Sequence, residues 1–266
     1  MDMRPPVPDQ VALYPITQAT TATFADLYLR LTFLFFIQSG SKKVVTSAKE
    51  VVAEQGDLLI VPAGSLLTME NRPVLDRSYR ALGVAFPDAY VAKVFEGRPT
   101  RSNRRDVEIL RAEPHRPTDI LPILHDTLER ESLPDVIQRH RIMEPLIWLR
   151  DKGVRLTPVA EEAPLSRVRR LIETDLGHPW RADEVARQLA MSEATMRRWL
   201  KSSGEGFAKI LMNARLEHGL SLLQTSDRAI SDIALECGFK TPSHFSDAFR
   251  KRFGIAPRQI RTSAAV

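Results

Sequence analysis

ADEVARQLAMSEATMRRWLKS (residues 182–202) and ISDIALECGFKTPSHFSDAFRKRF (residues 230–253) decide the fold of the last hundred residues. Each stretch predicts a short helix, a tight turn and a second helix with polar residues on one face. Ala186 and Ala234 fall where two helices must approach closely, and Ala190 and Gly238 follow four residues later, in the turn. The anchors repeat in register, so we interpret the two stretches as two copies of one structural unit.

The second helix of each copy has a buried side and a polar side. Met196 and Phe245 follow the two alanines after ten and eleven residues and are expected in the core. This is the helix-turn-helix pattern, which lays its second helix in the DNA major groove. We therefore predict reading helices at residues 192–203 and 242–253, joined by a helix over about residues 205–224.

Composition and charge agree with this interpretation. The chain has 266 residues, 43% of them hydrophobic, which is enough to bury sizeable cores in two domains. Residues 165–266 hold 17 Lys and Arg against 11 Asp and Glu, a net of +6, and the rest of the chain has a net of −1. The basic excess suits a polyanionic partner, although an ordinary basic surface would look the same.

Three features bear on the compartment. Cys237 is the only cysteine, which excludes an intrachain disulfide, suits a reducing compartment and predicts a small core residue. The apolar run at residues 31–37 is too short to cross a bilayer, and residues 1–10 do not resemble a signal peptide. We expect a cytoplasmic protein with no membrane partner.

The N-terminal half changes from strand to helix along its length. Residues 24–86 contain short β-rich pieces and turns, and the apolar run at 27–37 is typical of a strand buried on both faces, which predicts a small barrel or sandwich. Residues 118–131 and 134–152 are expected helices, and Pro145 should kink or split the second. The wide apolar stripe of that helix fits core packing or a dimer contact equally well. The predicted organisation is a loose arm at 1–22, a β-rich domain with C-terminal helices at 23–153, a linker at 154–164 and a DNA-binding domain at 165–266.

The last hundred residues resemble the DNA-binding domain of the AraC/XylS family of bacterial transcription regulators. The motifs that carry the resemblance are Trp180, Ala186, Leu189, Met191-Ser192, Gly206-Phe207, Arg215-Leu216-Glu217, Leu222-Leu223, Ile230-Ser231-Asp232-Ile233-Ala234, Gly238-Phe239, Pro242-Ser243-His244-Phe245, Ala248-Phe249-Arg250-Lys251-Arg252-Phe253-Gly254 and Pro257. They cover nearly the whole domain. The resemblance implies a regulator of transcription, by family habit an activator, that works with RNA polymerase.

The spacing of Gly56, Pro62-Ala63-Gly64, Leu67 and Asn71 is similar to the second motif of cupins. Thr46, Ala48 and Leu67 occupy the positions that hold histidine ligands in metal cupins. We therefore expect no metal and no cofactor. By this resemblance such domains bind small effectors, mediate dimerisation or do both. Several apolar side chains of this half could line a ligand pocket or simply form the core. They are Phe33, Phe35, Phe36, Leu58 and Ile60.

The expected fold class is thus α+β and multidomain. A small cupin-like β-barrel with flanking helices comes first, and an all-α domain with two helix-turn-helix units follows. The expected partners are double-stranded promoter DNA, RNA polymerase, a small-molecule effector or regulatory protein at the N-terminal domain, and a second copy of the chain.

In the first unit, Ala194, Arg197, Arg198 and Lys201 fall on one helical face, opposite Met196, Trp199 and Leu200. Guanidinium groups on an exposed face can contact guanine O6 and N7 in a bidentate manner. The alternative is that the two arginines meet only phosphates or water. Ala194 can touch a thymine methyl but cannot hydrogen-bond to a base through its side chain.

In the second unit, Ser243, His244 and Asp247 face the predicted reading side. Many relatives carry arginine at the position of Asp247, whose carboxylate can accept from cytosine N4 but repels phosphate. Arg250 and Lys251 are expected at phosphates or on the surface. His244 could instead be a structural histidine.

Two other classes of protein compete with a sequence-specific regulator. One is a cupin-type enzyme with a DNA-binding tail, against which the missing histidines and the lack of a nucleophile or phosphate-loop motif argue. The other is a non-specific nucleoid protein, which would spread its basic residues over the surface. We expect a regulator and not an enzyme.

Overall fold

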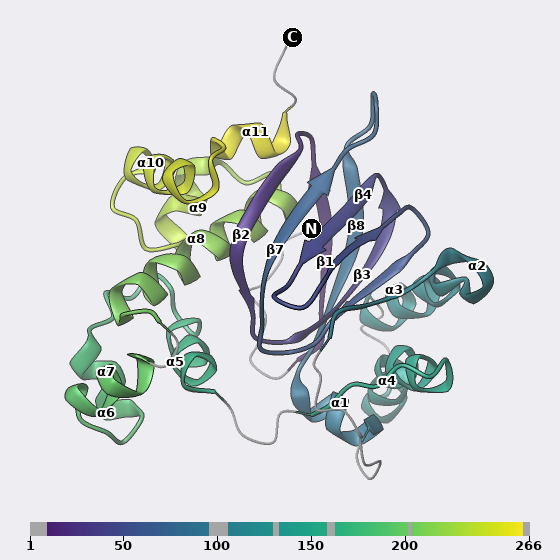
Figure 1. The fold of residues 1–266 in the computed structure, drawn as a ribbon, viewed down its shortest axis with the longest axis horizontal. Helices are drawn as coiled ribbons and strands as arrows, with labels where there is room; N and C mark the ends of the chain where they lie inside the picture. The colour runs from purple at the N-terminus through teal and green to yellow at the C-terminus, as the bar shows by residue number, and fades with distance from the viewer. Residues whose placement is uncertain (1–9, 96–105, 130–132, 159–162, 202–203, 263–266) are drawn as a thin grey trace. The chain divides into compact units, whose positions relative to one another are not determined.

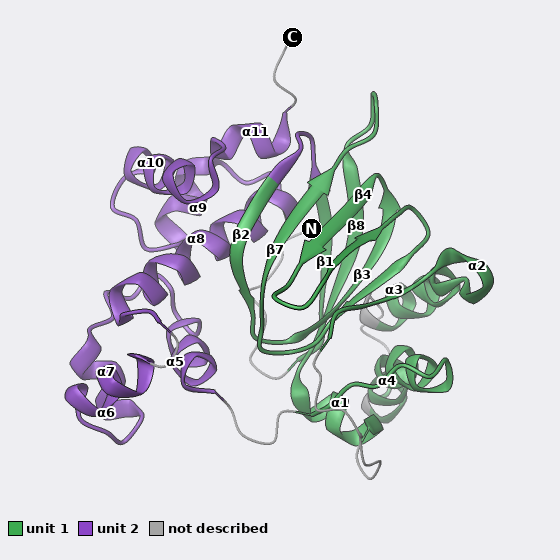
Figure 2. Ribbon diagram, in the orientation of Figure 1, with its two compact units in different colours: residues 1–17, 23–160 green, residues 18–22, 161–266 purple. Residues whose placement is uncertain are grey.

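A computed structural model describes residues 10–95, 106–129, 133–158, 163–201 and 204–262. The chain folds into two compact units, shown in Figure 2: residues 1–17 with 23–160, and residues 18–22 with 161–266. The division at residue 160 falls inside the stretch that we predicted as a linker.

Unit 1 is built on two antiparallel sheets (Figure 1). The five-stranded sheet has the order β1-β8-β3-β6-β9, and the four-stranded sheet has the order β2-β7-β4-β5. The strands are β1 (Ala12–Gln18), β2 (Ala22–Leu29), β3 (Thr32–Ser39), β4 (Ser41–Val45), β5 (Glu50–Ala53), β6 (Leu58–Val61), β7 (Ser65–Arg72), β8 (Tyr79–Phe86) and β9 (Glu108–Leu110).

Strand β3 is the centre of the larger sheet and is buried on both faces, as its continuous apolar sequence predicts. Leu34 and Phe36 point to a core shared with the helices, and Phe35 and Ile37 are also buried. Arg30 interrupts the apolar stretch, and Arg30 and Leu31 lie between the end of β2 and the start of β3. The predicted single strand is therefore two strands.

Helices cover one face of the larger sheet. They are α1 (Asp88–Phe95), α2 (Ala112–His115), the 3-10 helix η1 (Pro117–Ile120), α3 (Leu121–Glu129) and α4 (Asp135–Asp151). Leu146 and Leu149 of α4 are fully buried in the same core as Leu34 and Phe36. Helix α4 continues through Pro145 and is not split there, while the alternative, a kink at Pro145, stays a prediction.

The predicted α+β, two-domain architecture is confirmed, with the strands of unit 1 arranged in two sheets rather than one closed barrel. Residues 12–18 form β1, whose backbone pairs with β8 at the edge of the larger sheet, so this part of the predicted arm is not loose. Residues 1–9 of that arm lie outside the described residues. At the other end, Val154 and Leu156 of the predicted linker are buried in the core of unit 1.

Unit 2 is helical (Figure 1). Its helices are α5 (Pro164–Ile172), α6 (Ala182–Gln188), α7 (Glu193–Lys201), α8 (Phe207–Thr225), α9 (Ile230–Glu236), α10 (Pro242–Phe253) and α11 (Pro257–Arg261). The long helix α8 joins the pair α6–α7 to the pair α9–α10, as predicted. Residues 18–22 belong to this unit, where the Ala19 N–H donates to the Ile260 carbonyl at 2.8 Å.

Candidate nucleic-acid interface

The two predicted turns have the same backbone structure. The Met191 N–H donates to the Ala186 carbonyl at 2.9 Å, and 48 residues later the Phe239 N–H donates to the Ala234 carbonyl at the same distance. The residue between helix and turn has a positive φ in both units, 57° at Ala190 and 76° at Gly238. These bonds satisfy carbonyls at the end of the first helix and turn the chain sharply. The repeat that the sequence predicts is thus also present in the backbone geometry of the two units.

The second helices of the two units also begin in the same way, although the second one begins one residue later relative to its turn. Ser192 Oγ accepts from the Thr195 N–H at 3.1 Å at the start of α7. Thr241 Oγ1 accepts from the His244 N–H at 3.2 Å at the start of α10, where Pro242 occupies the first turn. The extra residue lies in the second turn, which explains the spacings of ten and eleven residues in the sequence. Of the predicted first helix, residues 202–203 lie outside the described part.

The inner faces are packed as expected. Met196 and Leu200 are buried in the first unit, together with Ala186 and with Val168 of α5. In the second unit Phe239 and Phe245 pack edge to face with their ring centroids 5.3 Å apart, and Phe249 and Phe253 continue the core. Cys237 is a buried core residue, and burial raises the pKa of its thiol to about 12.

The outer face of α7 carries the predicted reading residues. Ala194, Arg197, Arg198 and Lys201 are all exposed. Arg197 Nη2 donates to Glu193 Oε1, one turn earlier, so this guanidinium is oriented by a carboxylate on the same helix. Trp199, predicted in the core, is only partly buried, and the Arg167 guanidinium lies 5.1 Å from its ring centroid.

The outer face of α10 carries the second predicted set, and all of its members are exposed: Ser243, His244, Asp247, Arg250 and Lys251. The His244 ring meets Phe239 edge to face at 5.2 Å, so this histidine has a packing contact as well as an exposed side.

Two charged side chains of α8 are bound to the segment that contains α5 and the loop after it. Arg215 donates from Nε to the Leu176 carbonyl at 3.0 Å and from Nη2 to the His178 carbonyl at 2.8 Å. Glu217 does not pair with Arg215, its neighbour in sequence, but with Arg169 of α5. Burial raises the pKa of the Glu217 carboxyl. Both side chains therefore hold α8 against other segments of unit 2, and their partner residues lie too far away in sequence for any local pattern to indicate them.

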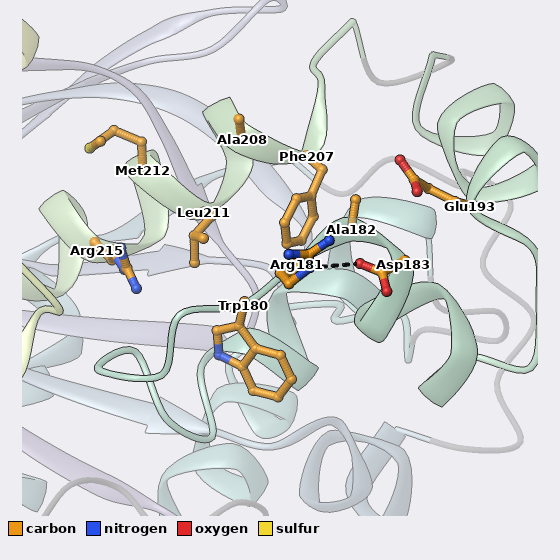
Figure 3. Close-up of a pocket in the computed structure, with 10 residues that line it drawn as sticks. All are labelled: Trp180, Arg181, Ala182, Asp183, Glu193, Phe207, Ala208, Leu211, Met212 and Arg215. Atoms are coloured by element: carbon orange, nitrogen blue, oxygen red, sulfur yellow. Dashed lines mark hydrogen bonds and ion pairs between the residues drawn. The ribbon is translucent and has the colours of Figure 1, made fainter.

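A cleft of about 380 Å³ opens between the start of α6 and the first half of α8 (Figure 3). Trp180, Phe207 and Leu211 give it an apolar lining, and Arg215 lies at one end. The Arg181 guanidinium pairs with Asp183 at 3.2 Å on its rim. No feature of the sequence analysis indicated this cleft.

In unit 1, the three positions that replace cupin ligands serve local structure. Thr46 Oγ1 accepts from the N–H groups of Ala48 and Lys49 in the turn after β4, and Leu67 is buried. Within the described ranges, no group of three or more His, Cys, Asp or Glu side chains could hold a metal ion. Among the described helices, none is long and apolar enough to cross a membrane.

An unexpected feature of unit 1 is the buried Lys42 of β4. Its Nζ donates to Asn71 Oδ1 at 2.6 Å and lies 4.7 Å from the centroid of the Phe35 ring. Burial lowers the pKa of this ammonium to about 7. The alternating strand pattern did not distinguish this lysine from an exposed one.

Comparison with known proteins locates two family models on the chain. Residues 185–263 match a helix-turn-helix domain, and residues 32–123 match the ExsA N-terminal regulatory domain. The first match covers most of both helix-turn-helix units, and the second covers most of the strands of unit 1.

The curated relatives align with only part of the chain. The HTH-type transcriptional regulator YdeO of Shigella flexneri is 33% identical over 94 residues, which is 35% of this chain and 37% of YdeO. The virulence regulon transcriptional activator VirF of Shigella flexneri is 30% identical over 113 residues, 41% of this chain and 43% of VirF. The chain thus covers about two fifths of these relatives.

Solved structures extend the likeness of fold to both units. Apo ToxT from Vibrio cholerae aligns with 94% of this chain and 95% of its own, with a TM-score of 0.64 and 17% identity. ToxT with a bound unsaturated fatty acid aligns with 97% of each chain, with a TM-score of 0.61 and 17% identity. The likeness covers the β-rich unit followed by the helical unit.

Proposed function

We propose that the protein is a sequence-specific DNA-binding transcription regulator of the AraC type that acts as an activator, which the match of residues 185–263 to a helix-turn-helix domain supports. The observation that carries the proposal is the repeated unit. Two turns with the same hydrogen bonds are each followed by a helix that is apolar inside and polar outside. One such helix reads about three to four base edges in a major groove.

The residues that contact DNA are assigned by exposure and chemistry. In α7, Arg197 and Arg198 read guanine, Ala194 meets a thymine methyl and Lys201 meets phosphate. When Arg197 contacts a base, its guanidinium must break its hydrogen bond to Glu193 or keep that bond with its other N–H groups. Glu193 therefore competes with the base for this guanidinium.

In α10, Ser243, His244 and Asp247 face bases, with Asp247 accepting from cytosine N4. Arg250 and Lys251 meet phosphates. Since Asp247 repels phosphate, the second unit holds its element less tightly than the first.

Unit 1 supplies regulation rather than catalysis. It accepts a small-molecule effector or a regulatory protein, which the likeness of residues 32–123 to a regulatory domain supports. The expected cupin ligand positions hold Thr46, Ala48 and Leu67, which supports a role other than metal chemistry. RNA polymerase at the promoter and a second copy of the chain are the remaining partners.

The proposal is tested by selecting binding sites for the full chain from a pool of randomised duplexes. A labelled selected duplex is then challenged with unlabelled bulk genomic DNA. We expect an enriched sequence whose complex survives a large mass excess of genomic competitor. No enrichment, together with equal competition by any DNA, would favour a non-specific nucleoid protein.

A further inference from the structure

A buried carboxylate lies where three helices of unit 2 meet. Glu217 of α8 has a side chain that is only 12% exposed. Its Oε2 accepts from Arg169 Nη2 of α5, and Arg169 Nε donates to Glu173 Oε1 at 2.9 Å. Helix α5 packs on α6 and α7 through Val168 and Ile172, so this ion pair ties α8 to the first helix-turn-helix unit.

The second oxygen of the same carboxylate faces the other unit. Glu217 Oε1 is buried and has no hydrogen-bond partner. Arg252 Nη2, on the reading helix α10, lies 3.9 Å from it. Arg252 Nε donates to Asn213 Oδ1 of α8 at 3.2 Å, so the guanidinium is already held beside Glu217.

We propose that Glu217 is a positioning residue that sets the spacing of the two reading helices, and that its contact with Arg252 closes to a hydrogen bond when α10 seats in its groove. The inference rests on the proposed function. A hydrogen bond between these groups needs a separation of about 2.7–2.9 Å, so a shift of roughly 1 Å is enough. Closure satisfies a buried acceptor that is costly to leave unpaired. The carboxylate then bridges Arg169 of one unit and Arg252 of the other.

The alternative is that the cluster only stabilises the fold. The two roles differ in the state that they affect. The Arg169–Glu217 pair is made in the free protein, whereas the Arg252–Glu217 bond is not. Removing Arg252 should therefore affect the DNA complex more than the free protein, and it should act on the distance between the two DNA elements rather than on either element alone.

The test uses the full chain with Arg252→Gln, which leaves the Arg169–Glu217 pair intact. Affinity is measured on the selected duplex and on duplexes with one or two base pairs inserted or removed between the two elements. Thermal unfolding is measured without DNA. We expect a modestly lower midpoint, because the bond from Arg252 to Asn213 is lost in the free protein. Binding at the native spacing should be about tenfold weaker, as a charged hydrogen bond implies, and the dependence on spacing should be flatter.

Two further variants sharpen the result. Arg252→Lys keeps a cation near Glu217 and should restore part of the spacing dependence. Arg258→Gln removes the same charge from an exposed position on α11 and should leave the shape of the spacing profile unchanged.

Equal losses at every spacing, matched by Arg258→Gln, would mean that Arg252 acts only through its charge. A large drop in the unfolding midpoint with an unchanged spacing profile would mean a purely structural role. Either result overturns the inference while the proposed function stands. If the wild-type protein shows no dependence on spacing, both the two-unit reading and this inference fail.

Discussion

One turn position is filled by Ala190 in the first unit and by Gly238 in the second, although both need a positive φ. A residue with a Cβ is strained there and glycine is not. We expect Ala190→Gly to raise the free energy of unfolding of unit 2 by about 0.5–1 kcal/mol, because relief of roughly 1–2 kcal/mol of left-handed strain is partly offset by the greater freedom of glycine in the unfolded chain. Denaturant unfolding followed by circular dichroism measures the change.

The reverse replacement is the matched comparison. A Cβ on Gly238 would lie 2.5 Å from the Leu176 carbonyl oxygen and 2.7 Å from Arg215 Nη2. Gly238→Ala should therefore destabilise the protein, by about 1–3 kcal/mol. Loss of stability in both variants would show that Ala190 is not strained.

Arg197 and Lys251 are exposed cations with different expected roles. Arg197→Ala should weaken binding to the preferred site by about 1–3 kcal/mol and relax one base position. Lys251→Ala should weaken binding to all sequences alike. It should also reduce the slope of log affinity against log salt concentration by about one. Titrations on preferred and random duplexes at several salt concentrations separate the two effects. An equal loss on both kinds of duplex for Arg197→Ala would contradict its base-reading role.

Lys42 makes the stability of unit 1 depend on pH. Its pKa is about 7 in the folded chain and near 10.5 when unfolded, so between these values the unfolded state binds one more proton. Stability should therefore rise with pH in this window, by up to about 1.4 kcal/mol per pH unit, and stay level below pH 7.

Replacing this ammonium removes the effect. Lys42→Met should be more stable than wild type at pH 7, and the difference should shrink as the pH is raised to 9 or 10. Denaturant unfolding at a series of pH values gives the difference curve directly. A difference that does not vary with pH would mean that Lys42 stays protonated in the folded protein throughout this range.

At the scale of elements, the sequence predicts what depends on neighbouring residues. Caps such as Ser192 and Thr241 and the turn at Gly238 use side chains within a few residues, so both helix-turn-helix units could be located in advance. The ion pair between Arg169 and Glu217 joins residues 48 apart and leaves no periodic signal. The cleft beside Trp180 was missed for the same reason.

Strands and helices of unit 1 show the same limit. The buried strand β3 could be predicted from its apolar run, but β1 could not, since its alternation is weak and its pairing depends on β8 far along the chain. Pro145 lies in a helix whose neighbours Ile142, Leu146 and Leu149 are held in the core. Tertiary packing there outweighs the local penalty of proline.

Helix α4 also exposes apolar side chains. Val136 is 69% exposed and Ile147 is 36% exposed, and their eleven-residue separation puts them on one face. If this face mediates the proposed homodimer, Val136→Lys should shift sedimentation toward the monomer. A loss of about 1.4 kcal/mol of association free energy would weaken self-association roughly tenfold. Leu75→Lys, at an apolar side chain that is 91% exposed in a turn, is the control. Unchanged or equally changed self-association in the two variants would exclude this face.

At the scale of the whole molecule, charge and fold are divided between the units. The basic excess lies in residues 165–266, which also contain both proposed reading helices, and the rest of the chain is close to neutral. Composition could therefore indicate which half of the chain a polyanion partner would contact. It could not identify an effector for unit 1, because a buried apolar core and an apolar ligand site use the same residue types.

The central claim is that one chain reads two DNA elements in successive major grooves. Helix α8 has 19 residues and is about 28 Å long, close to the ~34 Å of one duplex turn. Inserting about five base pairs between the two elements of the selected site moves one element to the opposite face of the duplex. Affinity measured before and after the insertion tests the claim most directly: we predict that high-affinity binding is lost. Unchanged affinity would mean that only one unit reads DNA.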